Sequence, residues 1–154
     1  MATVQKTIEV PVPVREAYNQ WTQFESFPRF MEGVQEVRQL DDRRLHWRAK
    51  VAGREVEWDA EITEQVPDRR IAWRSIQGRP NAGVVDFHRL DDMHTQVSLQ
   101  MEAEPEGFAE SVGDKVGVLD RQVEGDLKRF CDYMERRGTA EGEWRGEIDP
   151  PQPN

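Results

Sequence analysis

The stretch from Arg43 to Glu64, which reads RRLHWRAKVAGREVEWDAEITE, constrains the fold more than any other part of the chain. A two-residue turn at Ala52-Gly53 would pair the flanking residues so that their numbers sum to 105, as 47 and 58 do. One face then opposes basic or imidazole side chains to carboxylates, in the pairs Arg44–Glu61, His46–Asp59, Arg48–Glu57 and Lys50–Glu55. The other face is wholly apolar, in the pairs Leu45–Ala60, Trp47–Trp58 and Ala49–Val56. A slip of one residue would turn both tryptophans to water, so the pattern predicts a hairpin of defined register.

The amino-acid composition limits which class of protein this chain can belong to and which partners it can bind. The 154 residues are enough for one domain with a sizeable core, and 36% hydrophobic with 33% charged residues is typical of a soluble globular protein. No apolar run approaches the roughly 18 residues of a membrane span. The N-terminus MATVQKTIEV lacks the apolar core of a signal peptide, so we expect a cytoplasmic protein without stable membrane insertion. A net charge of −9 argues against nucleic acid as a partner, since nucleic-acid binding depends on basic surface.

Hydrophobic periodicity divides the rest of the chain into strands and helices. Alternation with a period of two predicts strands at 4–10, 34–40, 70–76, 83–90 and 95–101, besides the hairpin. Apolar spacings of three and four predict a helix over 14–24, and Ser26 is placed to cap a second short helix that Gly33 ends. A longer stripe, from Val112 to Met134, predicts one helix over about 108–137 that Gly138 ends.

An antiparallel meander with one apolar face needs a cover, and the long helix is the only element large enough. We therefore expect an α+β fold, with a curved antiparallel sheet of six to seven strands wrapped around a long C-terminal helix and two short helices after the first strand. This domain would span residues 1–138. Residues 139–154 are rich in Gly, Pro and Glu, which predicts a disordered acidic tail with Trp144 and Ile148 as its only apolar anchors.

The order of elements, the tryptophan hairpin and four local phrases resemble the START-like, or helix-grip, superfamily. The phrases are YNQWTQFESFPRFMEGVQEV at 18–37, PDRRIAWRS at 67–75, NAGVVDFHRL at 81–90 and DLKRFCDYMERRG at 126–138. Within this superfamily the chain is similar to the bacterial polyketide cyclase/dehydrase and lipid-transport group, which includes coenzyme Q-binding proteins. Cys131 departs from the pattern, because many members carry lysine there. The resemblance covers 3–138 and implies a helix-grip fold that holds an apolar ligand between sheet and helix.

The inner face assigned by alternation combines bulky rings with very small residues. Three tryptophans stand beside glycine, alanine and serine, a combination that can leave room for an apolar ligand. An ordinary core in which the indoles fill the space is the alternative. The residues expected to line a cavity are Trp47, Trp58, Trp73, Ser75, Val85, Phe87, Leu99, Met101, Val112 and Val116. Candidates for its mouth are Tyr18, Phe27, Phe30, Met31, Arg79 and Asn81.

The residue types that carry catalysis fall mainly outside this inner face. His46 and His88 lie on the outward parity of their strands, and His94 lies in a turn. The acids of the hairpin have basic or imidazole partners, and Cys131, the only cysteine, has no base beside it to activate its thiol. We therefore predict no catalytic residue, no metal site and no cofactor, because catalysis of cyclisation or dehydration calls for an acid or base within reach of the substrate.

Three functions are compatible with these features. The first is a carrier or chaperone for a hydrophobic small molecule such as a lipid, a quinone or a polyketide, which the aromatic inner face favours. The second is an aromatic polyketide cyclase or dehydratase, which needs a titratable group inside. The third is a stress-related interaction module that uses the acidic surface.

Overall fold

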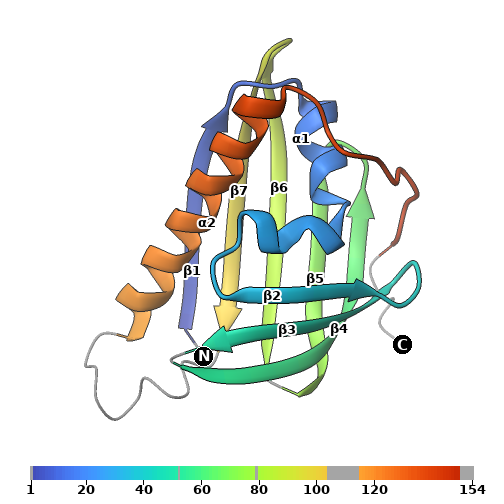
Figure 1. Cartoon of the computed structure of the whole chain (residues 1–154). Helices are drawn as coiled ribbons and strands as arrows, with labels where there is room; N and C mark the ends of the chain where they lie inside the picture. The colour runs from blue at the N-terminus through green and yellow to red at the C-terminus, as the bar shows by residue number, and fades with distance from the viewer. Residues whose placement is uncertain (1, 52, 79, 104–114, 150–154) are drawn as a thin grey trace.

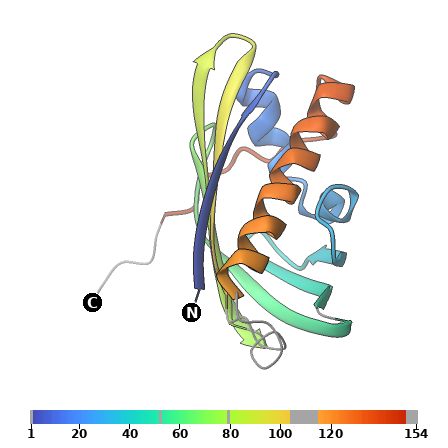
Figure 2. The ribbon, with the colours of Figure 1, turned by 90° about the vertical axis from the view of Figure 1, so that its left-hand side faces the viewer.

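A seven-stranded antiparallel sheet curls around one long helix in the computed structural model, which describes residues 2–51, 53–78, 80–103 and 115–149 (Figure 1). In the sheet order the strands are β1 (Ala2–Val10), β7 (His94–Ala103), β6 (Asn81–Asp91), β5 (Arg70–Gly78), β4 (Arg54–Val66), β3 (Arg44–Val51) and β2 (Val34–Gln39). The helices α1 (Val14–Trp21) and α2 (Lys115–Arg137) and the 3-10 helix η1 (Phe24–Arg29) lie on its concave side (Figure 2). The predicted α+β helix-grip fold is confirmed.

The β3–β4 hairpin has the register that its sequence predicts. Each Cα pair, from Arg44 opposite Glu61 to Val51 opposite Arg54, has residue numbers that sum to 105. Gly53 adopts a φ of +79° in the turn, a left-handed conformation that glycine takes at little cost. Trp47 and Trp58 stack on the inner face, with 5.6 Å between their centroids and 11° between their planes.

On the outer face of the hairpin, several charged side chains reach diagonally as well as straight across. His46 contacts Asp59, which is directly opposite, at 2.6 Å and Glu57 at 3.2 Å. Arg48 reaches diagonally to Glu55 at 3.0 Å. Diagonal neighbours lie within reach of long side chains on a sheet, so the charge pattern specifies the register without requiring every pair to be direct.

Two irregularities bend β4 against β5. The register shifts between Asp59 and Ala60 and again between Ile62 and Glu64. The second shift brings Gln65 opposite the inward-facing Ile71, whereas strict alternation from Ile62 would turn Gln65 outward. Gln65 is consequently buried in the interior.

The short helices after β1 differ in detail from the prediction. α1 ends at Trp21 rather than at residue 24, and η1 begins at Phe24, so Ser26 lies inside η1 and does not cap it. The physical reason is that Gln23 leaves helical geometry, with φ −91° and ψ 70°, and lets the aromatic residues of η1 turn into the core. Both elements thereby cover the concave face beside α2.

The C-terminal helix carries the predicted apolar stripe. Val123, Leu127, Phe130 and Met134 are buried, and the helix ends where Gly138, at φ +74°, donates its N–H to the Met134 carbonyl at 2.7 Å. The part of the prediction before Lys115, which includes Val112, lies outside the described residues. Within the described part of the chain, no helix combines the length and the apolar character needed to cross a membrane.

Residues 139–149, for which the composition predicts disorder, follow a defined path over the domain, and we call this segment the strap. The strap leaves α2, runs beside α1 and reaches β4, where Ile148 forms an antiparallel bridge with Gln65 (Figure 1). Its path has a physical cause, because the polar side chains of Asn19 and Gln20 in α1, and of Thr22 directly after it, are buried and accept hydrogen bonds from strap groups. Residues 150–154 of the predicted tail lie outside the described residues.

Candidate ligand-binding site

Aromatic rings form a continuous cluster on the concave face. The cluster joins the hairpin to both α-helices through ring contacts between centroids, namely Trp58–Trp47 at 5.6 Å, Trp47–Phe27 at 5.6 Å, Phe27–Trp21 at 5.6 Å, Trp21–Phe130 at 4.9 Å and Trp21–Phe87 at 6.2 Å. Most of these contacts are edge-to-face or tilted, the arrangements that aromatic quadrupoles favour. The rings therefore fill the space beneath α1 and η1.

The residues expected at a cavity mouth lie in this packed region. Tyr18, Phe27, Phe30 and Met31 are all buried, so the structure places them in the core rather than on an exposed rim. Their position follows from α1 and η1, which fold over the concave face and carry these side chains inward. Asn81, at the start of β6, is also buried, and Arg79 lies outside the described residues.

Around Trp73 the small residues accommodate the large one. A Cβ atom added to Gly83 would lie 2.4 Å from Cζ2 of Trp73 and 2.9 Å from the sulfur of Met101. The indole therefore occupies the space that a side chain at position 83 would need. At this position the alternative of a filled core describes the packing.

The inner face is less closed toward the β5–β6 turn. Trp58, Ser75 and Met101 are only partly buried, in contrast to Trp47, Val85, Phe87 and Leu99. In Figure 1 this is the lower end of the sheet, opposite the end that α1 covers. Of the other residues expected to line a cavity, Val112 lies outside the described residues, and so does the side chain of Val116.

Several polar atoms on the concave side are buried without a hydrogen-bond partner among the described residues. They include the indole nitrogens of Trp21, Trp47 and Trp58, the hydroxyl of Tyr18 and both ends of the Gln65 carboxamide. Burying such a group without a partner costs about 1–3 kcal/mol. The Trp47 and Trp58 donors belong to the stacked pair. This interior therefore offers mainly donors, which an acceptor oxygen would satisfy.

Titratable groups stand mostly on the outside, as the strand parity predicts. The pKa of His46 is raised by its contacts with Asp59 and Glu57 on the outer face, and the pKa of His94 is raised by Asp91. His88 is exposed. On the inner side, burial raises the pKa of Tyr18 to about 12. Among the described residues no cluster of His, Cys, Asp or Glu has the arrangement of a metal site.

Asp126 is a buried acid that the helical pattern missed. Burial raises its pKa to about 6, although the Arg129 guanidinium lies 2.5 Å away and the Glu32 N–H donates to the same oxygen at 3.2 Å. Arg129 also donates to the Phe30 carbonyl at 2.9 Å. The i, i+3 spacing of Asp126 and Arg129 was the available signal. Together they tie α2 to the segment between η1 and β2.

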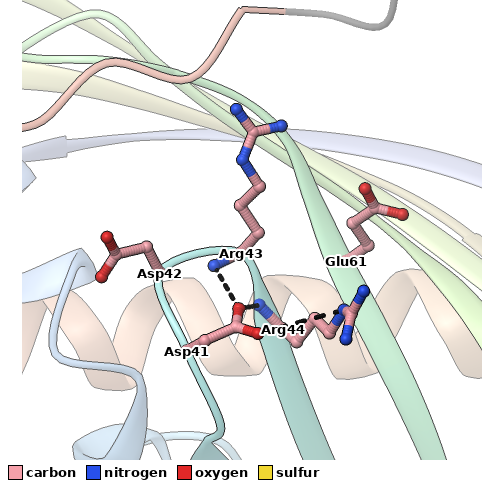
Figure 3. A pocket seen from close by; sticks show the side chains of 5 residues that line it. All are labelled: Asp41, Asp42, Arg43, Arg44 and Glu61. Atoms are coloured by element: carbon pink, nitrogen blue, oxygen red, sulfur yellow. Dashed lines mark hydrogen bonds and ion pairs between the residues drawn. The ribbon is translucent and has the colours of Figure 1, made fainter.

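The hollow drawn in Figure 3 lies on the outside of the fold, at the β2–β3 turn. It has a volume of about 450 Å³ and is lined by Asp41, Asp42, Arg43, Arg44 and Glu61. The carboxylate of Asp41 accepts the backbone N–H groups of Arg43 and Arg44, each at 2.8 Å. These contacts are those of an Asx turn, so Asp41 has a structural role there.

Comparison with known proteins identifies relatives over nearly the whole chain. The family model for polyketide cyclase/dehydrase and lipid transport matches residues 10–132. An uncharacterised 17.2 kDa protein of Streptomyces lincolnensis is 54% identical over 149 residues, which are 96% of this chain and 99% of that protein.

Solved structures share the fold. A protein from Deinococcus radiodurans has 27% identity and a TM-score of 0.69, with 88% of this chain and 99% of that chain covered. The Zhui aromatase/cyclase from Streptomyces sp. R1128 has 20% identity and a TM-score of 0.72, with 92% and 98% covered. A START superfamily protein from Mycobacterium smegmatis has 14% identity and a TM-score of 0.68, with 89% and 97% covered. The chain belongs to the polyketide cyclase/dehydrase and lipid transport family.

Proposed function

We propose that this protein binds an apolar, ring-containing small molecule that carries acceptor oxygens, and acts as its carrier or chaperone. The site is the part of the concave face toward the β5–β6 turn, with Trp47 and Trp58 as its principal contacts. The observation that carries this proposal is the stacked Trp47–Trp58 pair, whose two indole N–H groups are buried without a hydrogen-bond partner among the described residues.

The chemistry of the pair indicates the class of ligand. A stacked indole pair offers a flat, polarisable surface to another ring, and each N–H needs an acceptor when it leaves water. A quinone or polyketide carbonyl supplies that acceptor, whereas a pure hydrocarbon does not. The partial exposure of Trp58 leaves one edge of the pair accessible. The net charge of −9 makes nucleic acid an unfavourable partner.

A matched pair of probes tests the proposal. Menadione and 2-methylnaphthalene share one carbon skeleton, but only menadione carries carbonyl oxygens. Native mass spectrometry and tryptophan quenching should detect binding of both, with menadione the tighter ligand. Trp47→Phe and Trp58→Phe keep an apolar ring and remove the donor, so each should weaken menadione binding by roughly 3–10-fold, the value of one hydrogen bond, and leave 2-methylnaphthalene unchanged.

Trp144→Phe on the strap is the matched control, and it should bind both probes as the wild type does. Wild-type protein that binds neither probe, and from which no apolar molecule can be extracted, would refute the proposal. Equal menadione affinity in the wild type and in both hairpin variants would refute the role of the two indole donors.

Membership of a family that includes cyclases and dehydrases supports aromatic cyclisation as a second candidate. This function needs an acid or base beside the bound substrate. Asp126, with a pKa of about 6, has a suitable pKa but is held by Arg129 and the Glu32 N–H. A poly-β-ketone substrate that cyclises faster with wild-type protein than with Asp126→Asn would favour this candidate over a carrier.

A further inference from the structure

The strap is held to α1 through its own backbone. Side chains of α1 and of the residue that follows it accept three strap N–H groups, which are Ala140 to Glu16 at 3.1 Å, Glu141 to Gln20 at 2.9 Å and Trp144 to Thr22 at 3.2 Å. The match to the family model ends at residue 132, so the strap lies beyond the matched residues. These contacts order a segment that has few apolar side chains.

Arg145 and Ile148 fasten the far end of the strap. The Arg145 guanidinium donates to the Asn19 side chain at 2.6 Å, pairs with Asp68 at 2.8 Å and lies over the Tyr18 ring at 5.5 Å. Ile148 is buried, and its backbone exchanges two hydrogen bonds with Gln65 at 2.8 and 2.9 Å. The strap thus covers the place where α1 meets β4.

The closed strap buries polar groups at a cost. Beneath it, the Tyr18 hydroxyl, both ends of the Gln65 carboxamide and one oxygen of Asp68 are buried without a hydrogen bond of good geometry among the described residues. Burial also raises the pKa of Tyr18 to about 12. Each such atom opposes closure, because water would satisfy it when the strap lifts. The contacts that hold the strap are therefore partly offset.

This place connects to the interior. The Tyr18 ring packs edge-on against the inward-facing Phe87, with 5.4 Å between centroids. Gln65 is opposite Ile71, two residues along β5 from the inward-facing Trp73, which is a distance of about 7 Å in a strand. The strap therefore lies at the α1 end of the concave face, opposite the end that carries the proposed ligand site.

We propose that residues 139–149 form a latch that opens as a unit about Gly138, and that the opening exposes Tyr18, Gln65 and Asp68 to water. Gly138 suits a hinge because it adopts a φ of +74° directly after the last turn of α2.

Hydrogen exchange of the free protein tests the latch without any ligand. The amides of Glu141, Trp144, Ile148 and Gln65 should exchange with one common opening free energy, with protection roughly 100-fold below that of central β6 amides. Arg145→Ala should speed the exchange of these amides by about a further tenfold. The exchange rates in Arg145→Lys should lie between those of the wild type and those of Arg145→Ala. Strap amides that exchange only as slowly as β6 would overturn the latch.

A matched control separates the fastening from general charge effects. Arg15 pairs with Glu143 of the strap at 3.7 Å, with both side chains more than half exposed, so Arg15→Ala should leave exchange nearly unchanged. Exchange that rises equally in Arg15→Ala and Arg145→Ala would contradict the specific role of the buried contacts.

Discussion

At the scale of single residues, Gly83 shows how the core is fitted. Its absent side chain leaves the space that the Trp73 indole occupies, with Met101 on the other side. The sequence places Gly83 and Trp73 on one inner face, but it leaves two outcomes, an open cavity or a close contact. The close contact is observed because Trp73 and Gly83 are direct partners across the β5–β6 pair, so the indole lies in the space that a side chain at position 83 would occupy.

Gly83→Ala should therefore destabilise the protein by about 1–3 kcal/mol, the usual cost of overpacking a core. The same substitution in a Trp73→Phe background should cost less, because the smaller ring withdraws the atoms that the new Cβ would meet. Urea unfolding of the two single variants and the double variant measures this coupling. Additive free energies would show that the ring and the glycine do not share the space.

Asp126 makes a prediction about pH. Its pKa is about 6 in the folded chain and near 3.8 in the unfolded chain, so the folded state holds the proton more tightly. The resulting stabilisation is fully present below about pH 4 and is lost as the pH rises toward about 6. The free energy of unfolding of the wild type relative to Asp126→Asn should accordingly fall by roughly 1–3 kcal/mol between pH 4 and 7. A difference in unfolding free energy between wild type and Asp126→Asn that does not change with pH would contradict the raised pKa of Asp126.

At the scale of elements, the register of the hairpin could be predicted from the sequence, whereas the path of the strap could not. The β3–β4 register follows from a period-two pattern in which every pair on one face is charged and every pair on the other is apolar. The strap has no such pattern. It is held by its backbone N–H groups, which donate to polar side chains of α1, and because every residue except proline has this group, the strap sequence does not reveal the contact. Gln65 was missed for a related reason, since the irregularity that turns it inward depends on how β4 bends against β5.

The hairpin turn supports a further prediction. Gly53 has a φ of +79°, and an added Cβ would meet nothing within 4 Å, so a substitution there acts through backbone strain alone. Gly53→Ala should destabilise the protein by about 1 kcal/mol, and Gly53→Asn should cost less because asparagine enters the left-handed region more readily. Urea denaturation measures both changes. An equal loss for alanine and asparagine would point to something other than the backbone angle.

At the scale of the whole molecule, ligand binding and stability should be linked. A ligand that binds only the folded chain adds about 2.7 kcal/mol of stability at a free concentration of 100 times its dissociation constant. Thermal unfolding with increasing menadione should therefore show a rising midpoint in the wild type and a smaller rise at equal concentration in Trp58→Phe. A midpoint independent of menadione would contradict binding to the folded state.

The fold as a whole was predictable from the sequence, because strand alternation, one long amphipathic stripe and family phrases all point to the same architecture. The candidate site was predictable only in part. Trp47, Trp58 and Trp73 reach the inner face as expected, but Phe27, Phe30 and Met31 join the core instead of an exposed rim. Parity along a strand tells which face a side chain occupies, whereas the depth of that side chain depends on how α1 and η1 fold over the sheet.

The pairing of β1 with β7 also affects the order in which the strands pair during synthesis. Ile8 is opposite Val97, so during synthesis the first strand waits for a partner that is made about 90 residues later. At typical ribosomal rates this interval is roughly 5–20 s, long compared with the formation of each hairpin in the meander from β2 to β7. The nascent chain therefore carries an unpaired strand with valine and isoleucine on one face for most of its time on the ribosome. The β1–β7 pair forms after the meander, and a chaperone that shields residues 2–10 would act during the interval in which β1 is unpaired.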